Sequence, residues 1–265
     1  ASWGHPSTTG LETIDAFLSS DLIEPQDGQD HYGERLVRLP GLSTAVAIGR
    51  LTRPIPSRAS LGLPEDGAIF WCAQSLAKYL PRYDEVFPAI AARLPDCRFV
   101  FIEHGPELTG RFLERLNGAF AAHGLDGTRF CIVLRRMDPD AFRAAMGCAD
   151  VVLDSLGWSG CNSLVDALAH PLPIVTMAGD LMRGRHGAAL LGALGLERLI
   201  CPTLDVYVAT AAALGADAAM RSDARRDITA GLQLLNQDAA SAVAALEAEL
   251  IAAVRRRTLL LPLKR

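Results

Sequence analysis

Between residues 67 and 194, short apolar runs alternate with longer stretches in which apolar residues recur at helical spacing. The apolar runs are predicted to be strands at 68–73, 97–103, 129–134, 150–154 and 173–177. The other stretches are predicted to be helices at 83–93, 109–123, 139–146, 162–169 and 183–194. Because the strands alternate with helices and are apolar throughout, the pattern predicts an α/β fold with a doubly wound parallel sheet, covered on both faces.

The two ends of the chain depart from this alternation. Residues 4–25 predict one short helix and one strand, and a polar stretch and a Pro-rich segment follow. We therefore expect residues 1–63 to be the tail of a preceding domain plus an interdomain linker, and residues 64–265 to be the α/β domain. Residues 205–214 and 222–257 are rich in Ala, Leu and Arg, and they are expected to form a helical extension that packs on the sheet or crosses to a partner domain.

Composition narrows the class of partner. A net charge of −4 gives no electrostatic case for nucleic acid. The longest apolar runs are too short to span a membrane, and the start of the chain does not read as a signal peptide, so a cytoplasmic location is expected. The six cysteines form no close pair, which argues against a zinc site or a disulfide framework and favours buried, reduced thiols. The expected partner is a small molecule or a protein.

In a doubly wound sheet, ligands bind beyond the carboxyl ends of the strands. This rule gathers at one rim the loops at 74–78, 105, 135–138, 155–163 and 178–184. Residues 154–168 read DSLGWSGCNSLVDAL, in which an apolar strand breaks into small residues and then opens a helix. The first backbone N–H groups of such a helix lack partners, and their partial positive charge suits a phosphate or diphosphate. This junction is the best candidate for a nucleotide site.

Several segments, in the same order, resemble the catalytic region of the SPINDLY and O-linked N-acetylglucosamine transferase family, glycosyltransferase family 41. They cover residues 3–21, 71–81, 149–177 and 179–196. The resemblance implies a GT-B enzyme, in which a nucleotide-sugar donor lies between two Rossmann-like domains and is held mostly by the C-terminal one. This chain is similar to that C-terminal domain plus the last elements of the N-terminal domain.

The resemblance assigns a leaving-group role to Lys78, which falls on the family's lysine in the loop after the first strand. An ammonium group there would offset the charge that builds on the departing nucleoside diphosphate. The family's neighbouring polar residue, often Gln, contacts the sugar or phosphate. Direct alignment puts Ser75 at that position, with Gln74 one place earlier. The alternative for Lys78 is a solvated lysine at a helix start.

At the second loop, relatives carry a His-Thr-Thr motif that grips the diphosphate, followed by an Asp on the ribose. Cys161, Asn162 and Ser163 occupy the motif here, and Asp166 matches the Asp. Phe142 matches an aromatic or His ring that lies against the base. The alternatives are helix caps for Asn162 and Ser163, a favourable charge at the helix start for Asp166, and a core position for Phe142.

Other polar residues are weaker candidates for the same site. Relatives place a ribose lysine where Pro139 stands, and the substitutes are Arg135 or Arg136. A basic cluster at Arg183, Arg185 and His186 either faces phosphate or pairs with Asp180, and we favour a structural role for most of it. His5 is a candidate cleft residue or a plain loop histidine, and Trp158 is expected to shape its turn rather than to bind sugar.

The resemblance implies inverting transfer of a sugar to a protein Ser or Thr hydroxyl, with neither a metal nor a cofactor. Both UDP-N-acetylglucosamine and GDP-fucose are donors within the family, and the former is favoured here. Tetratricopeptide repeats and most of the N-terminal catalytic half are expected to lie outside this chain. Two alternatives remain: a nucleotide-sugar epimerase, and a catalytically silent interaction or scaffold domain that keeps the fold but not the donor site.

Overall fold

A computed structural model describes residues 1–72 and 74–260, so residues 73 and 261–265 of the predicted segments lie outside the described part of the chain. Its main body is a parallel five-stranded sheet with the order β5-β4-β3-β6-β7. The strands are β3 (Ile69–Trp71), β4 (Arg98–Ile102), β5 (Cys131–Leu134), β6 (Val151–Leu153) and β7 (Ile174–Val175). All five lie within the predicted runs, and the predicted fold class is confirmed.

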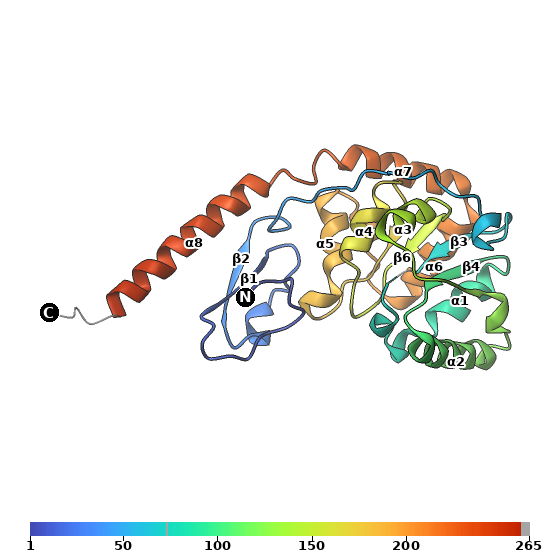
Figure 1. Ribbon diagram of the computed structural model, residues 1–265, viewed down its shortest axis with the longest axis horizontal. Helices are drawn as coiled ribbons and strands as arrows, with labels where there is room; N and C mark the ends of the chain where they lie inside the picture. The colour runs from blue at the N-terminus through green and yellow to red at the C-terminus, as the bar shows by residue number, and fades with distance from the viewer. Residues whose placement is uncertain (73, 261–265) are drawn as a thin grey trace.

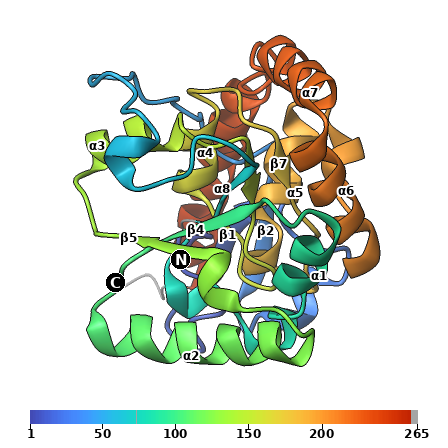
Figure 2. The ribbon, with the colours of Figure 1, turned by 90° about the vertical axis from the view of Figure 1, so that its right-hand side faces the viewer.

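Helices lie on both faces of this sheet (Figure 2). They are α1 (Val86–Arg93), α2 (Pro106–Ala122), α3 (Pro139–Met146), α4 (Asn162–Ala167), α5 (His186–Ala193), α6 (Leu204–Ala216), α7 (Ala218–Gly231) and α8 (Ala239–Leu260). Helix α1 packs against α6 and α2, while α3 packs against α4. The predicted helices are therefore present, and the stretch predicted at 222–257 is broken into α7 and α8 at residues 232–238.

The order of the strands reverses beside β3. The chain runs outward from β3 through β4 to β5, and then returns to place β6 on the other side of β3. In doubly wound sheets such a switch point opens a crevice at the carboxyl ends of the two strands. The loops that follow β3 and β6 are therefore brought side by side, although about 80 residues separate them in sequence.

The core of the main body is aromatic. Phe70 stacks on Phe99, and Phe87 meets the rings of both Phe99 and Phe101 edge-on. These side chains are almost wholly buried, as is Trp71. Their packing removes a large apolar area from water and fixes the strand ends from which the rim loops depart.

The N-terminal part differs from the prediction. It holds two strands, β1 (Ala16–Ser20) and β2 (Arg35–Leu39), paired in parallel. The sequence predicted one strand and a short helix within residues 4–25, and no helix forms there. Two arginines interrupt the apolar residues of β2, so its sequence does not show the apolar pattern of a strand. We call residues 1–42 the N-terminal unit. It shares a small core with the main body, in which Phe17 and Ile23 pack with Met182.

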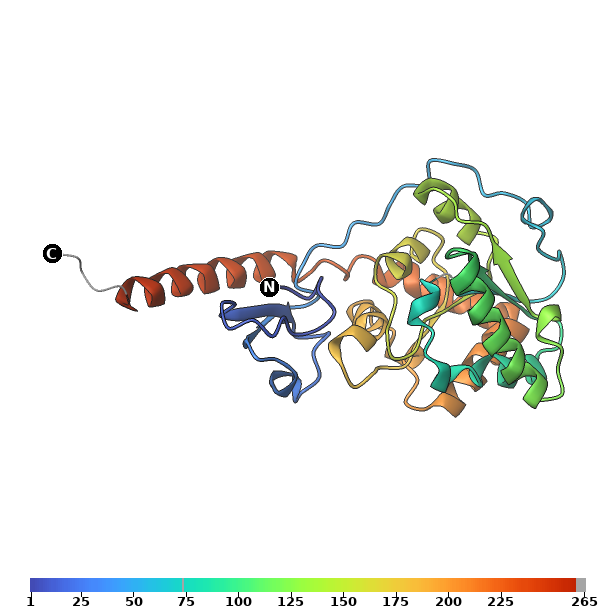
Figure 3. The ribbon, with the colours of Figure 1, turned by 60° about the horizontal axis from the view of Figure 1, so that its bottom comes forward.

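Helix α8 returns from the main body to the N-terminal unit and lies against β2 (Figure 1 and Figure 3). Glu249 of α8 forms ion pairs with Arg35 of β2 and with Arg256. The chain thus crosses between the two bodies twice, at residues 43–58 and at residues 232–238. Asn236 ties these connectors together, because its amide accepts from Val46 N at 2.7 Å and donates to Val46 O at 2.9 Å.

The six cysteines are all free in the described residues. Cys72, Cys97, Cys148 and Cys201 are buried as predicted, whereas Cys131 and Cys161 are partly exposed. Burial raises the pKa of the Cys161 thiol, and the nearby ammonium of Lys78 opposes that shift.

Candidate functional site

A cavity of about 570 Å³ lies at the carboxyl ends of β3, β6 and β7, where the switch-point rule predicts a ligand. We call it the rim cavity. The N-terminal unit closes one side of it, and loops of the main body form the rest. It is lined by Trp3, Gly4, Pro6, Gln74, Ser75, Lys78, Trp158, Ser159, Cys161, Asn162, Ser163, Arg183 and His186. Six residues predicted from the sequence are therefore brought together: Gln74, Ser75, Lys78, Cys161, Asn162 and Ser163.

Lys78 ends a short 3-10 turn (Leu76–Lys78) after β3. Its ammonium donates a hydrogen bond of 2.9 Å to the carbonyl oxygen of Ser159, in the loop after β6. It also lies 5.8 Å from the centre of the Trp158 ring. Burial lowers the pKa of Lys78, and the buried carboxyl group of Asp154 opposes that shift. The lysine predicted to stabilise a leaving group is thus held at the wall of the rim cavity.

Asp154, at the end of β6, organises the loop that carries half of this wall. Its buried carboxyl accepts hydrogen bonds from Gly160 N at 2.7 Å, from Ser159 Oγ at 2.5 Å and from Thr176 Oγ1 at 2.7 Å. Ser159 Oγ in turn accepts from Gly187 N, in the first turn of α5, at 2.8 Å. Burial raises the pKa of Asp154, and these hydrogen bonds oppose the shift. Sequence reasoning missed Asp154, whose only signal was an acidic residue at a strand end.

Gln74 joins the loop after β3 to the start of α4. Its side chain is buried, and its Oε1 accepts a hydrogen bond of 2.8 Å from Ser163 Oγ. Gly160 allows this close approach, because a Cβ there would lie 2.5 Å from Gln74 Nε2. Gln74 and Ser75 both line the cavity, and Gln74 fixes the geometry of the loop after β6.

Three further residues of the lining were expected to be structural. Trp158 has two cations near its ring, because the Lys78 ammonium and the Arg183 guanidinium each lie 5.8 Å from the ring centre. Arg183 forms no ion pair with Asp180, the partner weighed from the sequence, in the described part of the chain. His186 packs against Trp3 with ring centres 5.8 Å apart. Burial lowers the pKa of His186 to about 4, with a smaller contribution from the Lys78 charge.

The structure places the other predicted residues outside this lining. Phe142, which was predicted to lie against the base, packs on the core residue Trp71 with ring centres 5.7 Å apart. Asp166 faces Arg143 at 3.6 Å, half-buried one turn into α4. Arg185 donates to the carbonyl oxygens of Ile23 and Gly179, which ties the N-terminal unit to the main body. Arg136 is exposed in the loop before α3.

His5 is likewise exposed, and its Nδ1 lies 2.9 Å from the carbonyl oxygen of Ser7. Its neighbours Gly4 and Pro6 line the cavity, and the ring itself does not. This short stretch is anchored by Glu34, which accepts a hydrogen bond of 2.8 Å from Thr9 N. Hydrogen bonds from Thr8 and Thr9 lower the pKa of Glu34 to about 2.

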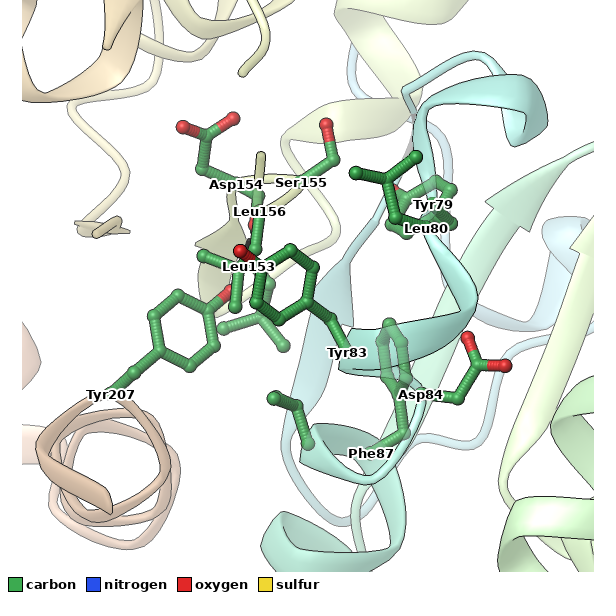
Figure 4. A pocket seen from close by; sticks show the side chains of 11 residues that line it. Tyr79, Leu80, Tyr83, Asp84, Phe87, Leu153, Asp154, Ser155, Leu156 and Tyr207 are labelled. Carbon is green, nitrogen blue, oxygen red and sulfur yellow. Dashed lines mark hydrogen bonds between the residues drawn. The ribbon is translucent and has the colours of Figure 1, made fainter. Parts of the chain in front are cut away.

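A second, much smaller cavity lies behind the loop after β6 (Figure 4). It is bounded by Tyr79, Tyr83, Leu153 and Tyr207, and the Tyr207 hydroxyl donates to the Asp154 carbonyl oxygen at 3.0 Å. Its volume is about 20 Å³, enough for about one water molecule and too small for a nucleotide. The rim cavity is therefore the candidate site.

Within residues 1–72 and 74–260, no group of three or more His, Cys, Asp or Glu side chains is arranged to hold a metal ion. Over the same residues, no helix has the length and apolar character needed to cross a membrane.

Comparison with known proteins identifies the family. The model of glycosyl transferase family 41 matches residues 45–233. The chain is 29% identical over 228 residues to a probable UDP-N-acetylglucosamine–peptide N-acetylglucosaminyltransferase SPINDLY of Oryza sativa subsp. japonica, which covers 85% of this chain and 24% of that protein. It is 28% identical to the Arabidopsis thaliana protein of the same description, over 88% of this chain and 26% of that one. The chain thus spans about a quarter of the length of these relatives.

Solved structures agree with this result. A mutant O-GlcNAc transferase of Thermobaculum terrenum superposes with a TM-score of 0.75 at 28% identity, over 94% of this chain and 46% of that one. A sucrose-phosphate synthase of Thermosynechococcus elongatus, at a TM-score of 0.63 and 17% identity, shares the fold. Since the family model covers well over half of the sequence, the chain belongs to glycosyltransferase family 41.

Proposed function

We propose that this chain is the donor-binding part of a glycosyltransferase that moves N-acetylglucosamine from UDP-N-acetylglucosamine to a protein Ser or Thr hydroxyl. The observation that carries the proposal is the rim cavity at the sheet's switch point, with the Lys78 ammonium in its wall. The names of the Oryza and Arabidopsis relatives include that donor and a peptide acceptor, which favours it over GDP-fucose.

In the proposed reaction the acceptor hydroxyl attacks the anomeric carbon from the face opposite the diphosphate, which inverts its configuration. The new C–O bond forms as the bond to the diphosphate oxygen breaks, and the hydroxyl proton passes to a base. Negative charge grows on the departing UDP, and Lys78 offsets it without a metal ion. Lys78 is pre-positioned for this task, because its hydrogen bond to Ser159 O is available for exchange against a phosphate oxygen.

Charge and pocket chemistry support donor binding over the silent scaffold. A scaffold domain would be expected to fill the rim with side chains, whereas the cavity here has a volume of about 570 Å³. That volume falls in the range typical of ligand sites, about 300–1,000 Å³. An epimerase would act on free nucleotide sugar, and the peptide acceptors named for the relatives favour transfer.

Calorimetric titration of the chain tests the proposal, with UDP, GDP, UDP-N-acetylglucosamine and GDP-fucose as ligands. Saturable binding of the uridine ligands, weakened in Lys78→Ala and unchanged in Arg129→Ala, is the expected result. Arg129 is an exposed cation that precedes β5, at the opposite edge of the sheet, so its removal controls for the loss of charge alone. Binding of the guanosine ligands instead would show that the donor is GDP-fucose. If none of the four ligands binds, the donor-site proposal for this chain is wrong.

A further inference from the structure

The lining of the rim cavity carries an excess of positive charge. Lys78 and Arg183 both line it, and no Asp or Glu is among the described residues of its lining. Asp154 lies behind the wall, where it is buried and engaged by three hydrogen-bond donors. Helix α4 is only six residues long, so its dipole contributes little to the potential in the cavity. The positive potential therefore comes mainly from the two side chains.

One residue, Ser159, links the Lys78 ammonium to the backbone of Arg183. Ser159 accepts from Lys78 Nζ through its carbonyl oxygen at 2.9 Å, and its backbone N–H donates to the Arg183 carbonyl oxygen at 2.9 Å. The Trp158 ring next to it lies 5.8 Å from each cation. The loops after β3, β6 and β7 thus converge on one residue, Ser159, and Asp154 fixes that residue in place through the Ser159 hydroxyl.

The backbone of Arg183 is held by Ser159, and its guanidinium can donate hydrogen bonds to a ligand. It contacts the Trp158 face, a position in which a cation is attracted to the ring and keeps its N–H groups for other partners. No carboxylate pairs with it in the described part of the chain. A planar guanidinium can donate two parallel hydrogen bonds to a phosphate, which a single ammonium cannot do.

From this geometry we infer that Arg183 is a second diphosphate-binding residue, which acts with Lys78 beside the Trp158 ring. The inference rests on the proposed function and adds a binding residue to it. A nucleoside diphosphate that leaves the sugar carries more negative charge than one ammonium can offset, and Arg183 supplies a second positive charge. The contribution should depend on the diphosphate and be absent for the nucleoside alone.

The test is a titration of the full chain with UDP, UMP and uridine, together with GDP, GMP and guanosine. The proteins compared are wild type, Arg183→Ala, Arg183→Lys, Lys78→Ala and the control Arg129→Ala. Arg183→Ala is expected to raise the Kd for the diphosphate roughly tenfold to a hundredfold, to raise that for the monophosphate less, and to leave that for the nucleoside unchanged. Arg183→Lys should recover part of the affinity, because it keeps the charge and loses the paired hydrogen bonds.

The outcomes separate the inference from the proposed function. If wild type binds a diphosphate and Lys78→Ala weakens it while Arg183→Ala does not, Arg183 only covers Trp158 and the inference is wrong. If wild type binds no nucleotide, the proposed function fails and the inference fails with it. Thermal unfolding checks that each variant folds. Should Arg183→Ala not fold, Arg183→Lys decides, because the inference requires this variant to bind the diphosphate more weakly than wild type does and the nucleoside equally well.

Discussion

His186 is expected to make the free energy of unfolding depend on pH. Its ring is mostly buried between the rim cavity and Trp3, and burial lowers its pKa to about 4 from the ordinary 6.5. In the unfolded chain the same ring takes up a proton at about pH 6.5. Between these values the unfolded state binds more protons than the folded state, so the free energy of unfolding rises with pH across this window and levels off above it.

The size of the effect follows from the two pKa values. With 1.36 kcal/mol per pH unit of difference, His186 lowers the free energy of unfolding by about 2 kcal/mol between pH 7.5 and pH 5, and by about 3 kcal/mol at pH 4. Asp154 acts with the opposite sign, because burial raises the pKa of its carboxyl and its protonation favours the folded state as pH falls. The quantity to compare is therefore the difference between wild type and His186→Gln.

Urea unfolding followed by circular dichroism, at half-unit steps from pH 5 to pH 7.5, measures this difference. His186→Gln is expected to lose the His186 contribution to the slope, whatever its constant effect on stability. His104→Gln removes a histidine from an exposed loop and serves as the matched control. Equal slopes for wild type and His186→Gln would refute the reasoning, because they would mean that the folded protein protonates His186 as readily as the unfolded chain.

Three more predictions concern the end of β6, the loop that follows it and helix α2. Asp154→Ala should lower the free energy of unfolding by about 3 kcal/mol or more, because three buried donors lose their acceptor. Asp154→Asn should lower it less. Urea unfolding compares the two variants, and equal losses would contradict the role of these bonds. Gly160→Ala should weaken UDP binding measured by calorimetry, since the added methyl would displace Gln74, and an unchanged Kd would argue otherwise. Gly110→Ala should raise the free energy of unfolding by up to about 1 kcal/mol, because its methyl meets no atom within 4 Å on the exposed face of α2; a melt with no gain would count against this.

The main body was predictable because its signals are local. A strand buried on both faces is apolar along its buried length, so β3 and β6 are visible in any window of the sequence, as is β4, in which only the first residue, Arg98, is polar. Strand β2 has Arg35 and Arg38 within its five residues, and it is a strand because of its pairing with β1, which no local pattern encodes. The break between α7 and α8 was missed for a related reason, since the leucines around it continue the apolar pattern of a helix.

The site was predictable at the level of loops and less so at the level of side chains. The switch-point rule joins the loops after β3 and β6 whatever their sequence, and the resemblance to the family selected Lys78 within them. Whether a rim side chain faces the cavity depends on tertiary contacts. Arg185 turns to backbone oxygens while Arg183, two residues earlier, turns to Trp158. Spacing alone does not distinguish these two arginines.

The clamp between Asn236 and Val46 has a mechanical consequence. Because Asn236 joins the two connectors at one level, a displacement of either connector is passed to the other. A movement of the N-terminal unit away from the main body would also have to break the hydrogen bond from Arg185 to Ile23 O and the packing of Phe17 and Ile23 on Met182, and it would shift Trp3 in the wall of the rim cavity. Helix α8 is fastened to β2 through Glu249, so a force on α8 reaches the rim cavity through the N-terminal unit.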